Sequence, residues 1–303
     1  MPSSSWPDLH QPGWGATRET LHMWTQVVGK VKLALCPFLN QWWEVAFALT
    51  ARGLSTGLVP AGDRSFEAVF DVVDHVLRID VTDGRGVQIP LRPRPVAEFH
   101  GDVMSALADF GIQAAPSPGP SEVPDPVPFA EQTGPGAYDP DAVRAWWRAM
   151  IATERVMQRF RTPFHGKSSP VNFFWGGFDL NHSRFNGERN PKADPTAGPI
   201  MRFGENEANL AVGFWPGNGP HPHAGFYAYL SPAPDGVADL PVEHGSWSAE
   251  MGEFVLPYDQ LRLEDDPDAA LLAFFTSVYE GSADLAGWDR QALEGDVPVG
   301  FAP

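Results

Sequence analysis

The chain has 303 residues, 43% of them hydrophobic and 12% aromatic, so it can bury a large core without disulfides or metal ions. Its 21 basic and 38 acidic residues give a net charge of -17, which argues against nucleic-acid partners and anionic membrane surfaces. The single cysteine, Cys36, excludes an internal disulfide and multi-cysteine metal motifs. Neither a secretory leader nor an apolar run of membrane-spanning length is present, and a cytoplasmic protein is expected.

The first half of the chain, residues 1–113, has the pattern of two helices that flank antiparallel strands. Thr17 suits the N-cap of a first helix, and Gly29 is expected to end it. The Asp83-Gly84 pair is typical of a hairpin turn. The expected elements are a helix over 17–28, strands over 42–51, 66–81 and 86–91, and a helix over 96–110.

Residues 114–140 are dense in prolines, which predicts a connector because proline fits neither helix interiors nor central strands. The second half, residues 141–303, then repeats the order of the first. Its expected elements are a helix over 142–160, strands over 171–180, 208–214, 225–230 and 250–256, and a helix over 267–285.

The fold class predicted from this order is α+β, with two similar halves that each consist of a helix, an antiparallel sheet and a helix. An internal duplication is suggested because Lys30 precedes Asn40-Gln41-Trp42-Trp43 much as Lys167 precedes Asn172-Phe173-Phe174-Trp175. Such halves would pack pseudo-symmetrically, with a pocket between them. The alternative is a pair of tandem lipocalin-like β-barrels.

Candidate chemistry must come from scattered residues, because the sequence has no phosphate-binding loop, nucleophile elbow or dinucleotide-binding glycine motif. His221 and His223, with His182 and Glu205 or Glu207, could ligate a metal, although a Pro- and Gly-flanked His-x-His is more often a solvated turn.

Alternation along the expected strands places further polar groups. Asp71 and His75 share a face with apolar residues, which predicts either satisfied core groups or acid and base groups in a pocket. His182 and Arg184 share a face that Asp179 does not, which favours an anion clamp or an exposed charge pair.

Aromatic residues beside amides form the candidate ligand site. Trp42 and Trp43 would point to opposite faces of their strand, and so would Phe174 and Trp175. The outward rings must be covered by the core, by the other half or by a ligand. A planar or amide-bearing molecule would suit these rings and the amides of Asn40, Gln41 and Asn172.

Motifs spread along nearly the whole chain resemble those of an uncharacterised bacterial family, the domain of unknown function numbered 5996 (DUF5996). They are Thr20-Leu21-His22-Met23-Trp24-Thr25-Gln26, Asn40-Gln41-Trp42-Trp43, Phe70-Asp71-Val72-Val73-Asp74-His75, Asn172-Phe173-Phe174-Trp175-Gly176, Phe178-Asp179-Leu180, Gly213-Phe214-Trp215-Pro216-Gly217, Phe254-Val255-Leu256-Pro257-Tyr258 and Trp288-Asp289-Arg290. The resemblance implies no established activity.

Three departures from the resembled family bear on metal binding. The family tends to have histidine at the positions of Gln41 and Asn172 and in a stretch near Glu205-Asn206-Glu207, which together would look like a metal site. Amides are poor ligands for transition metals but good hydrogen-bonding groups. We therefore expect this chain to have replaced metal chemistry with hydrogen bonding to an organic ligand.

Three functions follow. The first is a cofactor-independent enzyme that performs acid–base chemistry, of isomerase, lyase or cyclase type, on a small organic molecule between the halves. The second is a small-molecule binding protein without turnover, and the third is a metalloprotein built on His221, His223 and His182. The expected catalytic residues are His75, Asp71, His182 and Glu207, and the expected ligand-binding residues are Asn40, Gln41, Trp42, Trp43, Asn172, Phe174, Trp175, Arg184, Trp215 and Tyr227.

Overall fold

The computed structural model describes residues 5–194, 196–218 and 221–296. Residues 1–4, part of the segment in which no secretory leader is expected, lie outside the described residues. The first half contains α1 (Trp14–Leu35), η1 (Asn40–Trp42), β1 (Ala48–Thr50), β2 (Gly53–Ser55), β3 (Val59–Ala61), β4 (Arg64–Asp71), β5 (Val76–Val81), β6 (Gly86–Pro90) and α2 (Val96–Asp109). A connector with one short helix, η2 (Phe129–Glu131), leads to α3 (Pro140–Arg161).

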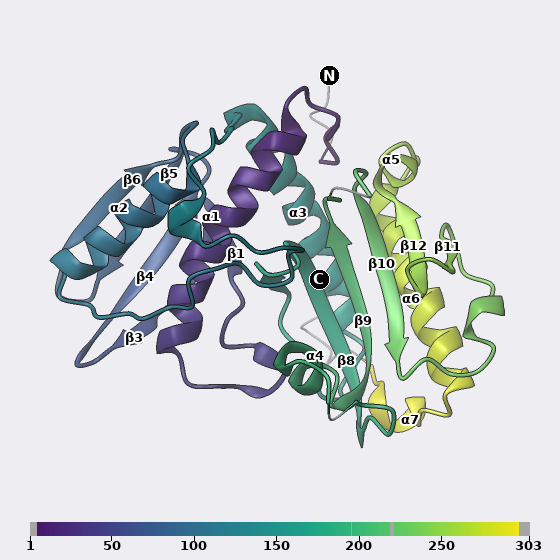
Figure 1. The fold of residues 1–303 in the computed structure, drawn as a ribbon. Helices are drawn as coiled ribbons and strands as arrows, with labels where there is room; N and C mark the ends of the chain where they lie inside the picture. Colours follow the sequence, from purple (N-terminus) through teal and green to yellow (C-terminus); the bar gives the residue numbers. More distant parts are fainter. Residues whose placement is uncertain (1–4, 195, 219–220, 297–303) are drawn as a thin grey trace.

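The second half continues with β7 (Asn172–Phe174), β8 (Asp179–Arg189), α4 (Pro199–Gly204), β9 (Glu207–Trp215), β10 (Gly225–Ser231), η3 (Val237–Asp239), β11 (Ser246–Ser248), β12 (Glu253–Pro257), α5 (Tyr258–Leu261), α6 (Pro267–Leu285) and α7 (Arg290–Leu293). Figure 1 shows α1 and α3 between the two sheets. None of the helices in the described part of the chain combines the length and the hydropathy that a membrane span requires.

Both sheets are antiparallel and open. The first has the order β1-β2-β4-β5-β6, with β3 also paired to β4, and the second has the order β11-β12-β10-β9-β8-β7. The α+β class is confirmed. The alternative of tandem barrels is wrong for the described residues, because neither sheet closes on itself. The pseudo-symmetric packing of the halves stays a prediction.

The long helices follow the sequence pattern closely, with two corrections, both in α1. Thr17 is not the N-cap, because the helix begins at Trp14 with Gly13 as its N-cap. The helix predicted over 267–285 has those bounds, and α3 begins where Asp139 accepts hydrogen bonds from the backbone N–H groups of Asp141 and Ala142. Gly29 does not end α1. It lies within the helix, and glycine is required at this position because Trp175 ring atoms come within 2.3 Å of where a Cβ would stand.

Three predicted strands are wrong in their extent, because turns interrupt them. Trp42 lies in η1 with φ +60°, and pairing begins only at Ala48. The stretch 66–81 is a hairpin that turns at His75 (φ +54°), and 171–180 turns at Phe178 (φ +60°). An alternating pattern does not reveal such turns, since these side chains rarely adopt positive φ.

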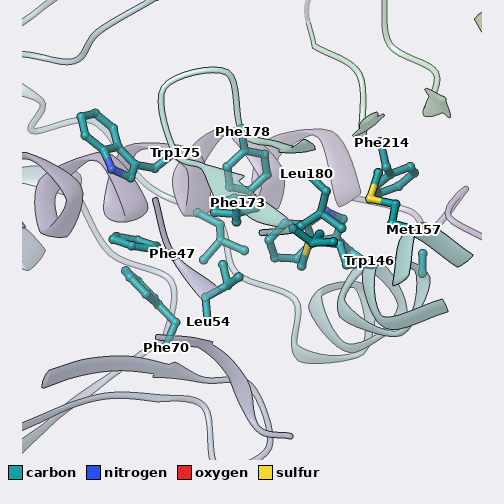
Figure 2. Close-up of a cluster of buried hydrophobic side chains, with 14 of the residues drawn as sticks. Phe47, Leu54, Phe70, Trp146, Met157, Phe173, Trp175, Phe178, Leu180 and Phe214 are labelled. Carbon is teal, nitrogen blue, oxygen red and sulfur yellow. The ribbon is translucent and has the colours of Figure 1, made fainter. Parts of the chain in front are cut away.

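One continuous aromatic core joins the two halves. Phe47, just before β1, and Phe173 on β7 exchange both backbone hydrogen bonds at 2.9 Å, and their rings stack. Figure 2 shows this pair between Phe70 of the first sheet and Phe178, whose ring stacks on Trp146 of α3 at a centroid distance of 4.9 Å. The halves are therefore bound by a shared core as well as by the connector.

The two faces of the second sheet have different neighbours. Leu180, His182 and Arg184 of β8 are buried against α3 and α6, where the ring of His182 meets that of Phe160. Asp179 and other residues that alternate with them point to the opposite face, which no long helix of the second half covers (Figure 1). This second face holds the candidate site.

Candidate functional site

A cavity of about 460 Å³ lies between the second sheet, the C-terminal part of α1, the connector, η1 and α4. Polar groups of β8, β9 and β10 form its floor. Its walls carry the rings of Trp42, Trp43, Phe174, Trp175 and Phe185. A mostly apolar cavity with a few converging polar groups is the usual form of a small-molecule site.

Asp179 and Tyr227 occupy the floor of this cavity. The Tyr227 hydroxyl donates a hydrogen bond of 2.5 Å to Asp179 Oδ2, and Asn181 Nδ2 donates to the same hydroxyl at 3.1 Å. Burial raises the pKa of Asp179 to about 7, an effect that the charge of Glu122 increases and the Tyr227 hydrogen bond opposes. The carboxyl group can therefore exchange a proton near neutral pH.

Gly213 allows Tyr227 to reach Asp179. Tyr227 and Gly213 are register partners on β10 and β9, and Gly213 is paired in turn with Asn181 of β8. The tyrosine ring lies across β9, only 2.0 Å from where a Gly213 Cβ would stand. A side chain at this position would lift the ring away from β8.

We expect Gly213→Ala to lower the free energy of unfolding by about 1–3 kcal/mol, because the new methyl group overpacks the Tyr227 ring. Gly101→Ala is the matched control, since no atom lies within 4 Å of its Cβ position in α2. That change should stabilise the chain by about 0.5–1 kcal/mol through helix propensity. Thermal denaturation compares the variants, and equal stabilities would contradict the ring position.

A lysine and a glutamate complete the polar wall on the α1 side. The Lys30 side chain is 7% exposed and its Nζ donates to Ser121 Oγ at 2.6 Å. Burial lowers the pKa of Lys30 and raises that of Glu122, and the attraction between the two charges opposes both shifts. Glu122 lies over Gly176, with its Oε2 only 1.9 Å from where a Cβ would stand.

The connector is fixed against α1 by side-chain hydrogen bonds to its backbone. Gln26 Nε2 donates to the Ser121 carbonyl at 2.8 Å, and the Ser121 N–H donates to Gln26 Oε1 at 2.7 Å. This pair of bonds places the adjoining Glu122 in the cavity.

A second cavity, of about 590 Å³, adjoins the first over β10 and β12 and shares Gly177, Asp179, Tyr227 and Tyr229 with it. Its walls include Glu253, whose pKa burial raises to about 7, with the charge of Asp179 adding to the shift. The Asp179–Tyr227 pair therefore stands at the boundary between two hollows on one face of the sheet.

Unusual backbone conformations gather around the first cavity. Gln41, Trp42 and Glu122 line it and have φ between +53° and +60°, and Phe178, at φ +60°, lies between the lining residues Gly177 and Asp179. Each such residue costs on the order of 1–3 kcal/mol and is held by its surroundings. Strain of this kind concentrates at functional sites.

Gln41 holds η1 against the start of β9. Its Nε2 donates to Asn206 Oδ1 at 2.8 Å, and its Oε1 accepts from Lys167 Nζ at 3.0 Å. Lys167 also pairs with Glu207 at 2.8 Å and faces the Phe185 ring. The amide of Gln41 thus bonds within the protein, at one of the positions that depart from the resembled family.

The structure brings together many of the residues predicted to bind a ligand. Gln41, Trp42, Trp43, Phe174, Trp175 and Tyr227 line the first cavity, and Trp215 lines the second. Asn40 is exposed beside them and donates to Gln41 Oε1 at 2.8 Å. Asn172 is buried on β7 and lines neither cavity.

Of the predicted catalytic residues, Asp71 ends β4 and His75 lies in the turn before β5, and neither lines a cavity. Asp71 is buried and paired with Arg52; burial raises its pKa, but the hydrogen bonds from Arg52 and from backbone N–H groups outweigh this effect and lower it. His75 Nδ1 shares a 2.8 Å hydrogen bond with the Tyr138 hydroxyl, and burial lowers its pKa. Glu207 adjoins the first cavity through Gln41.

His182 and Arg184 share a face, as alternation predicts, but this face is the buried one. Burial lowers the pKa of His182 to about 3, so the ring is neutral. Arg184 donates to the Phe160 carbonyl and its guanidinium lies 3.5 Å from the centre of the Phe160 ring. His221 and His223 line the second cavity, across the sheet from His182, and the described residues include no group of three that could hold a metal ion.

Sequence reasoning missed the groups that converge in the cavity: Lys30, Glu122 and Glu253 were not among the expected site residues, and Asp179 was noted without a role. The Gly176-Gly177 pair before Asp179 is the one local pattern that could have drawn attention to it, because paired glycines allow close approach of other groups.

These features define an α+β protein with two open antiparallel sheets and a cavity on the second. The family model of DUF5996, described as a family of unknown function, matches residues 6–295. The chain therefore belongs to the DUF5996 family, as its sequence motifs indicated. No curated protein and no solved structure matches it.

Proposed function

We propose that this chain is a cofactor-independent enzyme that moves a proton on a small organic molecule bound in the first cavity, with Asp179 as the acid–base residue. The position of Asp179 carries the proposal. Its carboxyl group lies on the floor of a cavity with aromatic walls, 2.5 Å from the Tyr227 hydroxyl.

The neighbours of Asp179 suit proton transfer. Before substrate binds, the pKa of about 7 leaves similar amounts of acid and carboxylate near neutral pH, which suits a general acid–base residue. The ionised carboxylate would take a proton from a C–H or N–H group of the substrate and return it to another atom. Tyr227 and Asn181 would keep the carboxyl group oriented throughout.

Deuterium exchange tests this function without knowledge of the substrate. The protein, free of tags, is incubated in D₂O with fractionated small molecules from a bacterial extract. The masses of these molecules are then measured by mass spectrometry. We expect at least one compound to gain carbon-bound deuterium, which survives return to H₂O, with the wild-type protein and not with Asp179→Asn. The control is Asp63→Asn, whose side chain is 94% exposed and distant from the cavity lining.

Binding without turnover is the second candidate, favoured by the number of aromatic rings in the cavity walls. In that case a compound would be retained by the wild-type protein but would gain no deuterium. If no compound is either retained or exchanged, both functions are contradicted.

A further inference from the structure

The two cavities around Asp179 contain more carboxyl groups than cationic groups to balance them. The described lining residues supply Asp179, Glu122, Glu205 and Glu253, against one ammonium group, that of Lys30. Glu205 accepts hydrogen bonds from the Tyr229 hydroxyl at 3.1 Å and from an asparagine amide. Among the ion pairs of the described residues, none involves Asp179, Glu205 or Glu253. Hydroxyl and amide donors take the place of counter-ions at Asp179 and Glu205.

Aromatic rings of the same cavity already face ammonium groups of the chain itself. Lys167 Nζ lies 4.5 Å from the centre of the Phe185 ring and 5.5 Å from that of Trp43. Lys30 Nζ lies 5.8 Å from the centre of the Trp175 ring. The faces of such rings attract cations, most strongly where water is excluded.

We infer that the ligand of this cavity is an organic ammonium compound, whose cationic nitrogen is held by Asp179 and whose apolar part lies between the aromatic walls. The inference rests on the proposed function only for the location of the site, and it adds the charge class of the substrate. The carboxylates provide the counter-charge, and the rings accept both the apolar part and the cation.

The pKa values of the carboxyl groups in the two cavities agree with an ammonium ligand. Burial raises the pKa values of Asp179 and Glu253 to about 7, and the charges of neighbouring carboxylates add to both shifts. A bound ammonium group would lower both, since an opposite charge nearby favours the ionised carboxylate. Binding at neutral pH is therefore expected to release protons.

Three probes of nearly equal shape separate charge from hydrophobic contact: 2-phenylethylamine, 2-phenylethanol and 3-phenylpropanoate. Isothermal titration calorimetry with the full-length protein at pH 8 should give one site for the amine, with a Kd at least about tenfold lower than that of the alcohol. The amine stays protonated throughout, like a lysine side chain with a pKa of about 10.4. Its affinity should fall about tenfold from pH 8 to pH 6, as a carboxyl group with a pKa near 7 becomes protonated.

Two variants test whether Asp179 is the group that binds the amine. Asp179→Asn should weaken amine binding about tenfold and reduce its pH dependence to the part that Glu253 contributes, while the affinity for the alcohol stays unchanged. Asp63→Asn removes the same charge from the surface and should change neither value. This control matters because a chain with a net charge of -17 attracts any cation weakly and without a defined site.

The inference is overturned if the amine does not bind, if the alcohol or the propanoate binds as tightly, or if Asp179→Asn leaves amine binding unchanged. Failure here is distinct from failure of the proposed function. Deuterium exchange on a neutral or anionic compound would uphold the enzyme and refute the ammonium ligand. Amine binding as described, with no exchange on any compound, would uphold the ligand class and refute catalysis.

Discussion

Replacing Trp175 with alanine is expected to lower the free energy of unfolding by about 3–5 kcal/mol, the usual cost of removing a large ring from a core. The Trp175 side chain is 4% exposed, packs flat against Gly29 of α1, and donates from Nε1 to the Val45 carbonyl at 2.9 Å. One face of the ring lines the cavity, but the rest joins α1 to the segment before β1. Trp175 therefore belongs to the core and also lines the cavity.

Thermal denaturation of matched variants tests this. Trp42→Ala removes the same ring from a partly exposed position at the cavity edge and should cost far less than Trp175→Ala. Gly29→Ala should also destabilise the chain, because its methyl group would lie 2.3 Å from Trp175 ring atoms. A change in melting temperature after Trp175→Ala no larger than that after Trp42→Ala would show that the Trp175 ring is not part of the core.

The second large effect is a gain in stability. Asp179→Asn is expected to stabilise the folded chain by about 4 kcal/mol at pH 8 and only slightly at pH 4. The pKa of Asp179 rises from 3.8 to about 7 on folding, so the folded state binds its proton more tightly than the unfolded state. The contribution of Asp179 to the free energy of unfolding is fully present below about pH 4 and is lost as the pH rises towards 7. The neutral amide avoids this loss and can still accept the Tyr227 hydrogen bond.

Melting temperatures of Asp179→Asn and wild type between pH 4 and pH 8 measure this difference, with Asp63→Asn as the control that should remain flat. Glu253→Gln should act in the same direction, and the double variant should gain less than the sum, because the charge of Asp179 contributes to the raised pKa of Glu253. A variant that is less stable than the wild type at pH 8 would mean that the ionised carboxylate supports the fold. The expected gain is typical of residues kept for function at the expense of stability.

The long helices and the strands β6, β9, β10 and β12 were predictable because their local patterns agree with their packing, whereas β2, β3 and β11 were not predicted. Asp139 and Pro140 mark the start of α3, and the spacing of apolar residues carries it to Arg161. The interruption of strands at His75 and Phe178 was not predictable, since tertiary contacts hold these residues at positive φ. The end of α1 was predicted wrongly at Gly29, because this glycine accommodates the Trp175 ring and does not end the helix.

The site was predictable only in part. Alternation correctly separated Asp179 from His182 and Arg184, but local spacing does not tell which face of a sheet the helices cover. The histidine and arginine lie under α3 and α6, and the aspartate lies in the cavity. Glu122 could not be assigned at all, because its position depends on the path of an irregular connector against α1.

The path of the connector against α1 determines how occupancy of the cavity can be measured. The walls come from α1 of the first half, from the connector at Ser121 and Glu122, and from the second sheet, so the cavity exists only when the whole chain is folded. A ligand that binds the folded state alone stabilises it by mass action, by about 2.7 kcal/mol at a free concentration one hundred times Kd. The melting temperature of the entire protein therefore reports on the cavity, and compound collections can be ranked by it before any reaction is known.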